Sequence, residues 1–343
     1  TLVPVIGLVQ VGIQSIADRY TYLPSVGLVL AGVLAADAVW RRFRLEPGFL
    51  AVVAAGLGVG WAGLTRWQIG FWTNTETLFR RAVAVTKNNY LAHNNLGFYL
   101  GNQGRQAEAM AQYQASLRIK PDYLDALNNL GRALAEQGRN AEALVLLEAA
   151  LRQQPRHVEV NNNYGNALAN VGRLEEALRH YRIALEARPD HADAHNNMAV
   201  ALAMLGRLDE ALEHMREAVR LRPGHAPSHS NLGNVLATAG RWAEALEEFR
   251  LALQLNPNEA QAHNNVANVL CELGRLDEAE PHYRRALELN ARNPEAHFNL
   301  GLLLARRGQR DAAIEHLRQA VLLKPDYTEA RNQLRRLGGG DAP

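Results

Sequence analysis

The sequence repeats itself every 34 residues between Tyr90 and Pro325. Seven copies follow one another without a gap, and we number positions within each copy from its first residue. Those first residues are Tyr90, Leu124, Val158, Ala192, Ala226, Ala260 and Pro294. A fixed period of this length is typical of an array in which each copy is one supersecondary unit stacked on its neighbours.

Small residues at three positions predict that each copy is a pair of helices. Position eight is glycine or alanine and position twenty is always alanine, as expected where two helices approach closely. Position fifteen is glycine in all seven copies, which is typical of a helix end in the left-handed conformation. Proline closes most copies, where it ends one helix and starts the next.

This combination of period, small residues, turn glycine and proline resembles the tetratricopeptide repeat family. The resemblance covers residues 90–326 and implies an all-α, right-handed superhelix of seven full repeats plus caps. Two departures are mild. The family's aromatic residue at position four is replaced by histidine in five copies, and Ala291 stands where the sixth copy would carry its proline.

The ends of the array have features of caps. Residues 72–88 match the second helix of a repeat and are expected to form a half-repeat cap. Residues 327–337 begin another first helix that is polar and rich in arginine, typical of a capping helix. Residues 338–343 are predicted to be disordered.

Two apolar runs precede the repeats and predict a membrane hairpin over residues 23–67. Three arginines lie between the runs and tryptophans flank them, while neither run has a polar face. A hairpin packed in a water-soluble domain is the alternative, because glycine and alanine dilute both runs. The positive-inside bias places the repeats on the extracytoplasmic side. Residues 1–22 are expected to be interfacial or the end of an earlier membrane segment, and the chain to be a fragment.

The string from Ala17 to Gly27, ADRYTYLPSVG, followed by a second apolar run and these repeats, is similar to a group of membrane enzymes. It resembles the tail of transmembrane, tetratricopeptide-repeat O-mannosyltransferases and their bacterial relatives, which use lipid-linked sugars. The resemblance implies a catalytic membrane domain upstream, so that this chain holds no catalytic residues of its own. It also suggests that Arg19 contacts a lipid phosphate, although an interfacial ion pair explains Arg19 better.

Asparagine at positions six and nine provides the candidate binding surface. Positions two, six, nine and thirteen share the helix face opposite the packed side. Asparagine is a mediocre helix former, so its recurrence indicates that a contact favours it. The candidates are Asn95, Asn129, Asn163, Asn197, Asn231, Asn265 and Asn299 at position six and Asn166, Asn234 and Asn268 at position nine.

A carboxamide pairs with a peptide unit whatever the side chain, so this surface is predicted to bind extended polypeptide. The repeats of the nucleocytoplasmic O-linked N-acetylglucosamine transferases resemble these in carrying such a ladder. The alternative is that position-six amides bond neighbouring repeats and set the superhelix pitch. Asparagine at position five is explained better by packing.

Other kinds of site are disfavoured. The net charge of +2 with interspersed signs gives no surface for nucleic acid. Histidines at position four recur at a packing position without companion ligands, so neither a metal nor another cofactor is expected. The single cysteine, Cys271, excludes an intramolecular disulfide. The sequence therefore predicts a membrane-tethered domain that presents polypeptide to an upstream glycosyltransferase, or alternatively a membrane-anchored assembly scaffold without enzymatic activity.

Overall fold

The computed structural model describes residues 74–339, and before them only nine isolated residues between Arg42 and Arg66. The predictions for residues 1–22, for Arg19, for most of the hairpin at 23–67 and for residues 340–343 therefore lie outside the described residues. Within the described part every element is a helix, and no strand occurs. None of those helices combines the length and apolar character needed to cross a bilayer.

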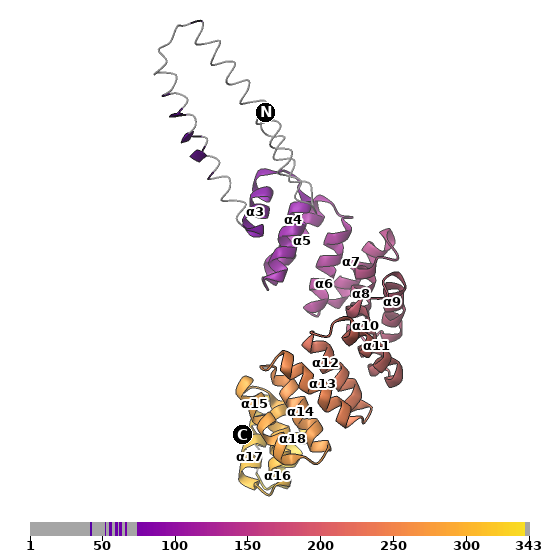
Figure 1. Ribbon diagram of the computed structural model, residues 1–343, viewed down its shortest axis with the longest axis vertical. Coiled ribbons are helices and arrows are strands. Elements are labelled where there is room, and N and C mark those ends of the chain that lie inside the picture. Colours follow the sequence, from indigo (N-terminus) through magenta and orange to yellow (C-terminus); the bar gives the residue numbers. More distant parts are fainter. Residues whose placement is uncertain are drawn as a thin grey trace. The chain divides into compact units, whose positions relative to one another are not determined.

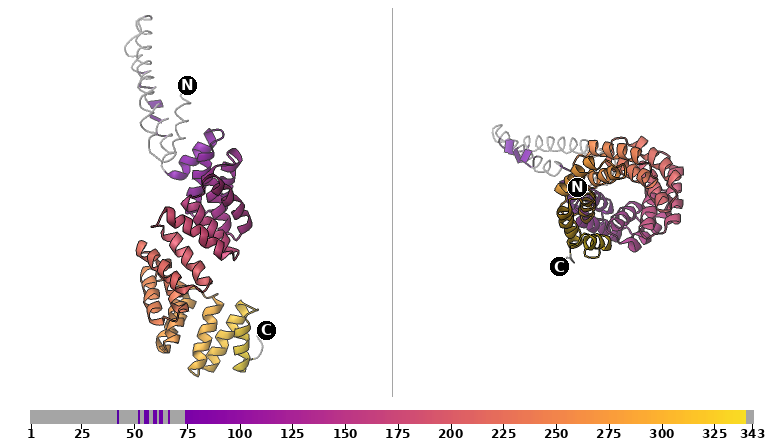
Figure 2. Two further views of the ribbon diagram at one scale, coloured as in Figure 1. Left: turned by 90° about the vertical axis from the view of Figure 1, so that its right-hand side faces the viewer. Right: turned by 90° about the horizontal axis from the view of Figure 1, so that it is seen from below.

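The helices belong to two compact units, residues 1–155 and 156–343, and each is described by itself. Figures 1 and 2 show the helices as a succession of antiparallel pairs. The first unit contains α3 (Thr75–Val85), α4 (Tyr90–Asn102), α5 (Gln106–Ile119), α6 (Leu124–Glu136) and α7 (Asn140–Gln153). The second contains α8 (Val158–Asn170), α9 (Leu174–Ala187), α10 (Ala192–Met204), α11 (Leu208–Leu221), α12 (Ala226–Thr238), α13 (Trp242–Leu255), α14 (Ala260–Glu272), α15 (Leu276–Leu289), α16 (Pro294–Arg306), α17 (Arg310–Leu323) and α18 (Thr328–Arg336).

The helix pairs confirm the repeat prediction. Every first helix begins at position one of its copy, from Tyr90 to Pro294. The glycine at position fifteen has a positive φ in each copy, between 72° and 78°, which is the left-handed conformation that ends the helix. The glycine therefore separates the two helices of a pair in all seven repeats.

The core of each pair is built around positions eight, twenty and twenty-four. All seven position-twenty alanines are fully buried. A Cβ added to Gly97 would lie 2.7 Å from the ring of Tyr113, at position twenty-four, and one added to Gly165 would lie 2.5 Å from the ring of Tyr181. Glycine is needed at these two sites because a buried aromatic ring occupies the space of a side chain.

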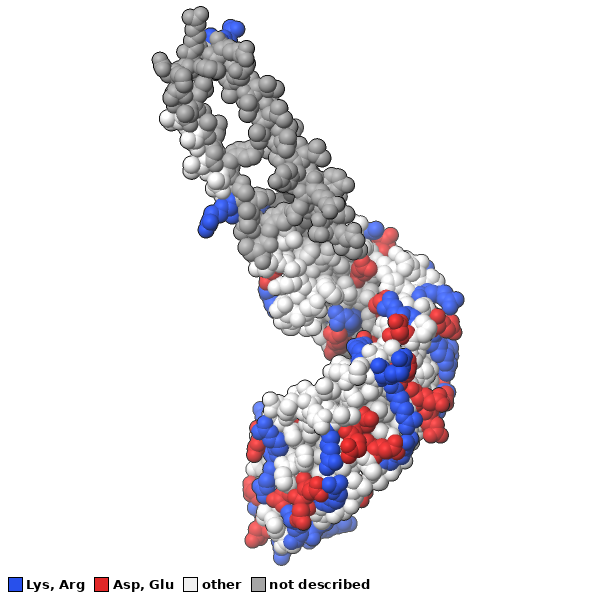
Figure 3. All heavy atoms as spheres, in the orientation of Figure 1, with Lys and Arg blue, Asp and Glu red and all other residues white. Residues whose placement is uncertain are grey.

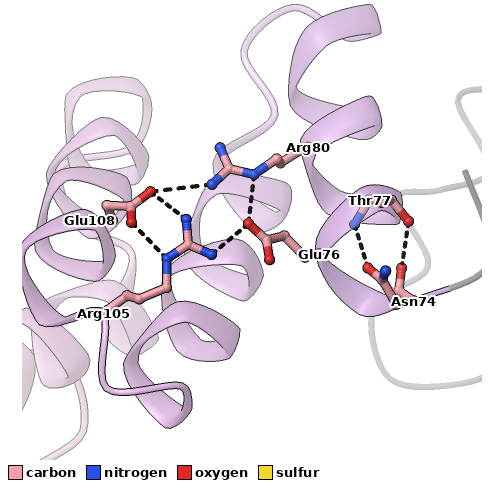
Figure 4. Close-up of polar contacts among 6 residues, drawn as sticks. All are labelled: Asn74, Glu76, Thr77, Arg80, Arg105 and Glu108. Atoms are coloured by element: carbon pink, nitrogen blue, oxygen red, sulfur yellow. Dashed lines mark hydrogen bonds and ion pairs between the residues drawn. The ribbon is translucent and has the colours of Figure 1, made fainter.

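The half-repeat α3 is joined to repeat one by a charged network (Figure 4). Arg105 donates to Glu76 (2.7 Å) and forms two bonds with Glu108 (2.6 and 2.7 Å), while Arg80 donates to both carboxylates. The Arg80 and Arg105 hydrogen bonds lower the pKa of Glu76. Asn74 caps α3 by accepting from the backbone N–H of Thr77 (2.9 Å). These contacts bond α3 to the first repeat, and the capping role of residues 72–88 stays a prediction.

Charged side chains of both signs are interspersed over the repeats, as the face shown in Figure 3 illustrates. Six of the seven second helices follow an arginine at position sixteen that forms an ion pair three residues later, as Arg241 does with Glu244 (2.5 Å). At the carboxyl end, Tyr327 packs on Phe298 with ring centroids 4.9 Å apart, which joins the last helix α18 to repeat seven.

Candidate functional site

The position-six asparagines bridge successive repeats. In the second unit, Nδ2 of Asn197 donates to Oδ1 of Asn162 at position five of the preceding repeat (3.1 Å). Asn231 donates in the same way to Asn196 (2.8 Å). Such bonds fix the spacing of neighbouring first helices, as the pitch-setting interpretation of position six predicts. They also give the position-five asparagines a structural role.

The first unit contains the same bridge once. Nδ2 of Asn129 donates to Oδ1 of Asn94 (3.1 Å), and Nδ2 of Asn94 donates to Asn95 (3.4 Å). Bridging does not remove these amides from solvent, since six of the seven position-six side chains remain half-buried and Asn163 is 8% exposed. Most of these residues therefore keep some exposure to solvent.

In repeats three and six the position-nine amide differs from the position-six amide, because a tyrosine hydroxyl donates a hydrogen bond to its oxygen. The hydroxyl of Tyr283, at position twenty-four, donates to Oδ1 of Asn268 (2.7 Å). Tyr181 donates to Oδ1 of Asn166 with the same geometry (2.7 Å). Burial raises the pKa of both phenols, so both remain neutral donors at physiological pH. In repeat five position twenty-four is Phe249, and Asn234 instead accepts from Asn265 (3.0 Å).

The asparagine surface of repeats five to seven encloses a pocket of about 430 Å³. Its lining comes mainly from the predicted face of the first helices together with residues of α13 and α15. It consists of Asn234, Ala237, Thr238, Trp242, Phe249, Asn265, Asn268, Val269, Cys271, Glu272, Tyr283, Asn299, Leu302, Leu303 and Arg306. Four of the ten predicted asparagines therefore meet in one hollow, whereas Asn95, Asn129, Asn163, Asn166, Asn197 and Asn231 do not line it.

The pocket is lined by amide groups, by apolar side chains and by two charged residues. Glu272 and Arg306 occupy position thirteen of successive repeats, and neither forms an ion pair with another described residue. Burial raises the pKa of the Cys271 thiol, whose sulfur lies 3.7 Å from the Tyr283 hydroxyl. That cysteine therefore remains a protonated lining residue rather than a thiolate nucleophile.

Sequence reasoning missed the aromatic residues of the pocket. Trp242 begins α13 at position seventeen, a place held by leucine in repeats three, four and six. Tryptophan in place of leucine is the sequence feature that could have indicated this pocket. Tyrosine at position twenty-four was missed as well, although in repeats three and six it accompanies asparagine at position nine.

The position-four histidines form hydrogen bonds between the two helices of a pair. Nε2 of His195 donates a hydrogen bond to the carbonyl of Pro189 (2.9 Å), so that its Nδ1 accepts a hydrogen bond from Nδ1–H of His214 (2.9 Å). His263 pairs with His282 and His297 with His316 at 3.0 Å. Burial lowers the pKa of His214, His282 and His316, and the facing histidine makes a smaller contribution in the same direction. These half-buried pairs serve as packing residues, and the described residues contain no group of three metal-binding side chains.

Comparison with known proteins agrees with the repeat fold. Family models described as tetratricopeptide repeat match residues 128–178, 165–226, 224–290 and 258–324, and a further TPR repeat model matches residues 100–138. The matches together extend over about two thirds of the chain. The chain belongs to the tetratricopeptide repeat family.

Curated relatives of this tetratricopeptide repeat chain include protein O-mannosyl-transferases. The chain is 30% identical to TMTC1 of Homo sapiens over 115 residues, which are 33% of this chain and 13% of that protein. It is 34% identical to Tmtc1 of Drosophila melanogaster over 114 residues, 32% of this chain and 13% of that protein. The matched region is thus about an eighth of each relative's length.

Solved structures show the same repeat fold. Pseudomonas aeruginosa PilF is 24% identical with a TM-score of 0.55, and the alignment covers 62% of this chain and 97% of PilF. A tetratricopeptide repeat protein of Parabacteroides merdae is 16% identical with a TM-score of 0.56, covering 74% of this chain and all of that protein. At these identities the likeness concerns the fold alone.

Proposed function

We propose that the repeats bind an extended polypeptide segment and present it to a glycosyltransferase domain of the same protein. The observation that carries the proposal is the pocket of repeats five to seven, where Asn234, Asn265, Asn268 and Asn299 lie beside apolar walls. Ligand pockets typically have volumes of about 300–1,000 Å³ and combine apolar lining with a few placed polar groups. A hollow of about 430 Å³ with four amides fits that description.

The chemistry of the lining favours polypeptide. The amides pair with backbone groups irrespective of side chains, while Trp242 and Leu302 offer apolar contact to one ligand side chain. Hydrogen bonds contribute about 0.5–1.5 kcal/mol each and one buried apolar side chain about 1.5–3 kcal/mol. Several such contacts, less the cost of ordering the ligand, give roughly micromolar binding.

The link to glycosyl transfer comes from the relatives. Their names describe protein O-mannosyl-transferases, and the matched part of each is its repeat region. In this proposal the predicted hairpin at residues 23–67 tethers the repeats to the membrane, on the extracytoplasmic side. A bound acceptor held close to an active site reacts as though at high concentration, which is the advantage of presentation.

Peptide binding is tested with the whole 343-residue chain. The probe is a pool of random, uncharged dodecapeptides, acetylated, amidated and labelled with fluorescein, and the readout is fluorescence anisotropy. Trp242→Ala and Leu302→Ala should each weaken binding about tenfold, because each removes an apolar wall. Leu322→Ala, at a 64% exposed leucine outside the pocket, is the control and should change nothing. Equal peptide binding by the wild type and all three variants would refute the pocket as the binding site.

Presentation needs a second assay, in the full-length protein. Radiolabelled mannose on a polyprenyl-phosphate carrier serves as the donor and the same peptides, with serine and threonine included, as acceptors. Presentation predicts that Leu302→Ala raises the KM for peptide and leaves the turnover of a saturating peptide unchanged. Peptide binding without any sugar transfer would favour the assembly scaffold.

A further inference from the structure

The two asparagine positions present opposite chemistry to the groove. At position six the NH2 group is used between repeats: Nδ2 of Asn299 donates both to Asn268 (2.9 Å) and to Asn264 (3.4 Å). At position nine the oxygen is used instead. Oδ1 of Asn268 accepts from the Tyr283 hydroxyl and from Asn299, which occupies both of its lone pairs.

This network fixes the orientation of the Asn268 amide. Nδ2 of Asn299 donates to Oδ1 of Asn268 and also to Oδ1 of Asn264, so the oxygen of the Asn268 amide faces Asn299. A neutral phenol behind that oxygen donates to it as well. The amide cannot rotate by 180° without placing its NH2 group against the NH2 group of Asn299. Its two N–H donors therefore remain at the pocket lining, without a partner among the described residues.

Two further position-nine residues have the same polarity. Oδ1 of Asn166 accepts from Tyr181 and Oδ1 of Asn234 accepts from Asn265, while neither NH2 group has a partner in the described part of the chain. Asn234 and Asn268 are one repeat apart in the same pocket. Donors therefore recur along the groove at repeat spacing.

We propose that the position-nine amides donate hydrogen bonds to the carbonyl oxygens of a bound polypeptide. Position-six amides and the tyrosines at position twenty-four set the orientation of the position-nine amides. The proposal rests on the polypeptide binding proposed above and names the backbone group that is recognised. Asn234 and Asn268 are the contact residues. Tyr283 is a positioning residue that acts through Asn268.

The test exchanges donors for acceptors at one atom. Asn268→Asp keeps an oxygen for Tyr283 and Asn299 and replaces the NH2 group by a second oxygen, so its Tm should match that of the wild type. Its carboxylate faces peptide carbonyls, and binding of the uncharged dodecapeptide pool should weaken about tenfold. Thr238→Asp is the control, because it adds an equal charge to the same pocket at a side chain outside the amide network, and its peptide binding should stay close to that of the wild type.

Tyr283→Phe separates positioning from a merely structural role. In the wild-type background it should weaken peptide binding about threefold, because Asn268 loses one of the two bonds that orient it. In the Asn268→Asp background the same change should have no effect on binding, since no donor is left to orient. A wild-type chain that does not bind the peptides would refute the proposed function. A wild-type chain that binds, with Asn268→Asp binding equally well or more tightly, would refute the donor assignment alone.

Discussion

Repeats one and six both have a buried tyrosine at position twenty-four, but the hydrogen bonding of its hydroxyl differs between them. In repeat six Tyr283 donates to Asn268 at position nine. In repeat one position nine is Phe98, 51% exposed, and the buried Tyr113 hydroxyl has no hydrogen-bond partner among the described residues. The frame of the helix pair is therefore independent of the polar contact, which exists only where position nine is asparagine.

The grooves of the two units differ in charge as well. In repeat two Arg132 and Glu136 neutralise each other at 2.6 Å, whereas Glu272 and Arg306 in the second unit have no such partner. Unpaired charges and free amide donors both occur in the pocket of repeats five to seven. The repeat pattern thus maintains the fold, while the residues on positions nine and thirteen give each groove its own charge and polarity.

The largest expected effect tests the frame in repeat one. Gly97→Ala places a Cβ 2.7 Å from the Tyr113 ring and 3.0 Å from the carbonyl of Ala109, so it should destabilise the chain by about 1–3 kcal/mol. Gly101→Ala, one helical turn later, meets nothing closer than 3.7 Å and should stabilise by about 0.5–1 kcal/mol. Urea denaturation of both variants measures the difference. Equal effects would show that the close approach at Gly97 is not real.

The two tyrosines should respond with opposite signs. Tyr283→Phe removes a hydrogen bond and should cost about 1 kcal/mol. Tyr113→Phe removes a buried hydroxyl that has no partner, so it should be neutral or stabilise by up to about 1 kcal/mol. Thermal unfolding followed by circular dichroism measures both. Destabilisation of the same size by the two changes would contradict the comparison of repeats one and six.

Acid should destabilise the second unit more than the first. The lowered pKa of His214, His282 and His316 means that the unfolded chain binds more protons below the ordinary histidine value of about 6.5. Stability is therefore complete above that pH and falls as the pH drops toward the folded-state pKa. The Tm should decrease between about pH 7 and pH 5.

A substitution borrowed from repeat one tests the cause. His282→Gln gives repeat six the histidine and glutamine pair formed by His93 and Gln112 (2.8 Å), and glutamine can either donate or accept. The acid-induced fall in Tm should shrink in this variant. A fall of unchanged size would exclude the pairing of His263 with His282 as its source.

The smallest effect is expected on the outer surface. Arg241→Ala removes an ion pair with Glu244 whose partners are 37% and 53% exposed. Solvent screening makes such pairs weak, so the Tm should shift far less than it does for Gly97→Ala. A shift comparable with that of Gly97→Ala would mean that the position-sixteen arginines maintain the repeat frame.

The sequence pattern predicted the helix pairs, their turns and their close contacts because each follows from a local requirement. A positive φ selects glycine at position fifteen, and close approach selects alanine at position twenty. The groove face of the asparagines also follows from helical periodicity. Their hydrogen bonds do not, because whether Asn265 bonds to position five or to position nine depends on the rotamers of two repeats. The pocket could not be predicted from the repeat pattern, because its lining residue Trp242 departs from that pattern.

The most direct test of a polypeptide groove is site-specific photo-crosslinking. p-Benzoylphenylalanine is placed at Leu302 in the pocket or at the exposed Leu322 outside it, and the whole chain is irradiated with the labelled dodecapeptides. A binding groove predicts a crosslink from position 302 that unlabelled peptide suppresses, and little from position 322. Equal, unsuppressed labelling at both positions would contradict it.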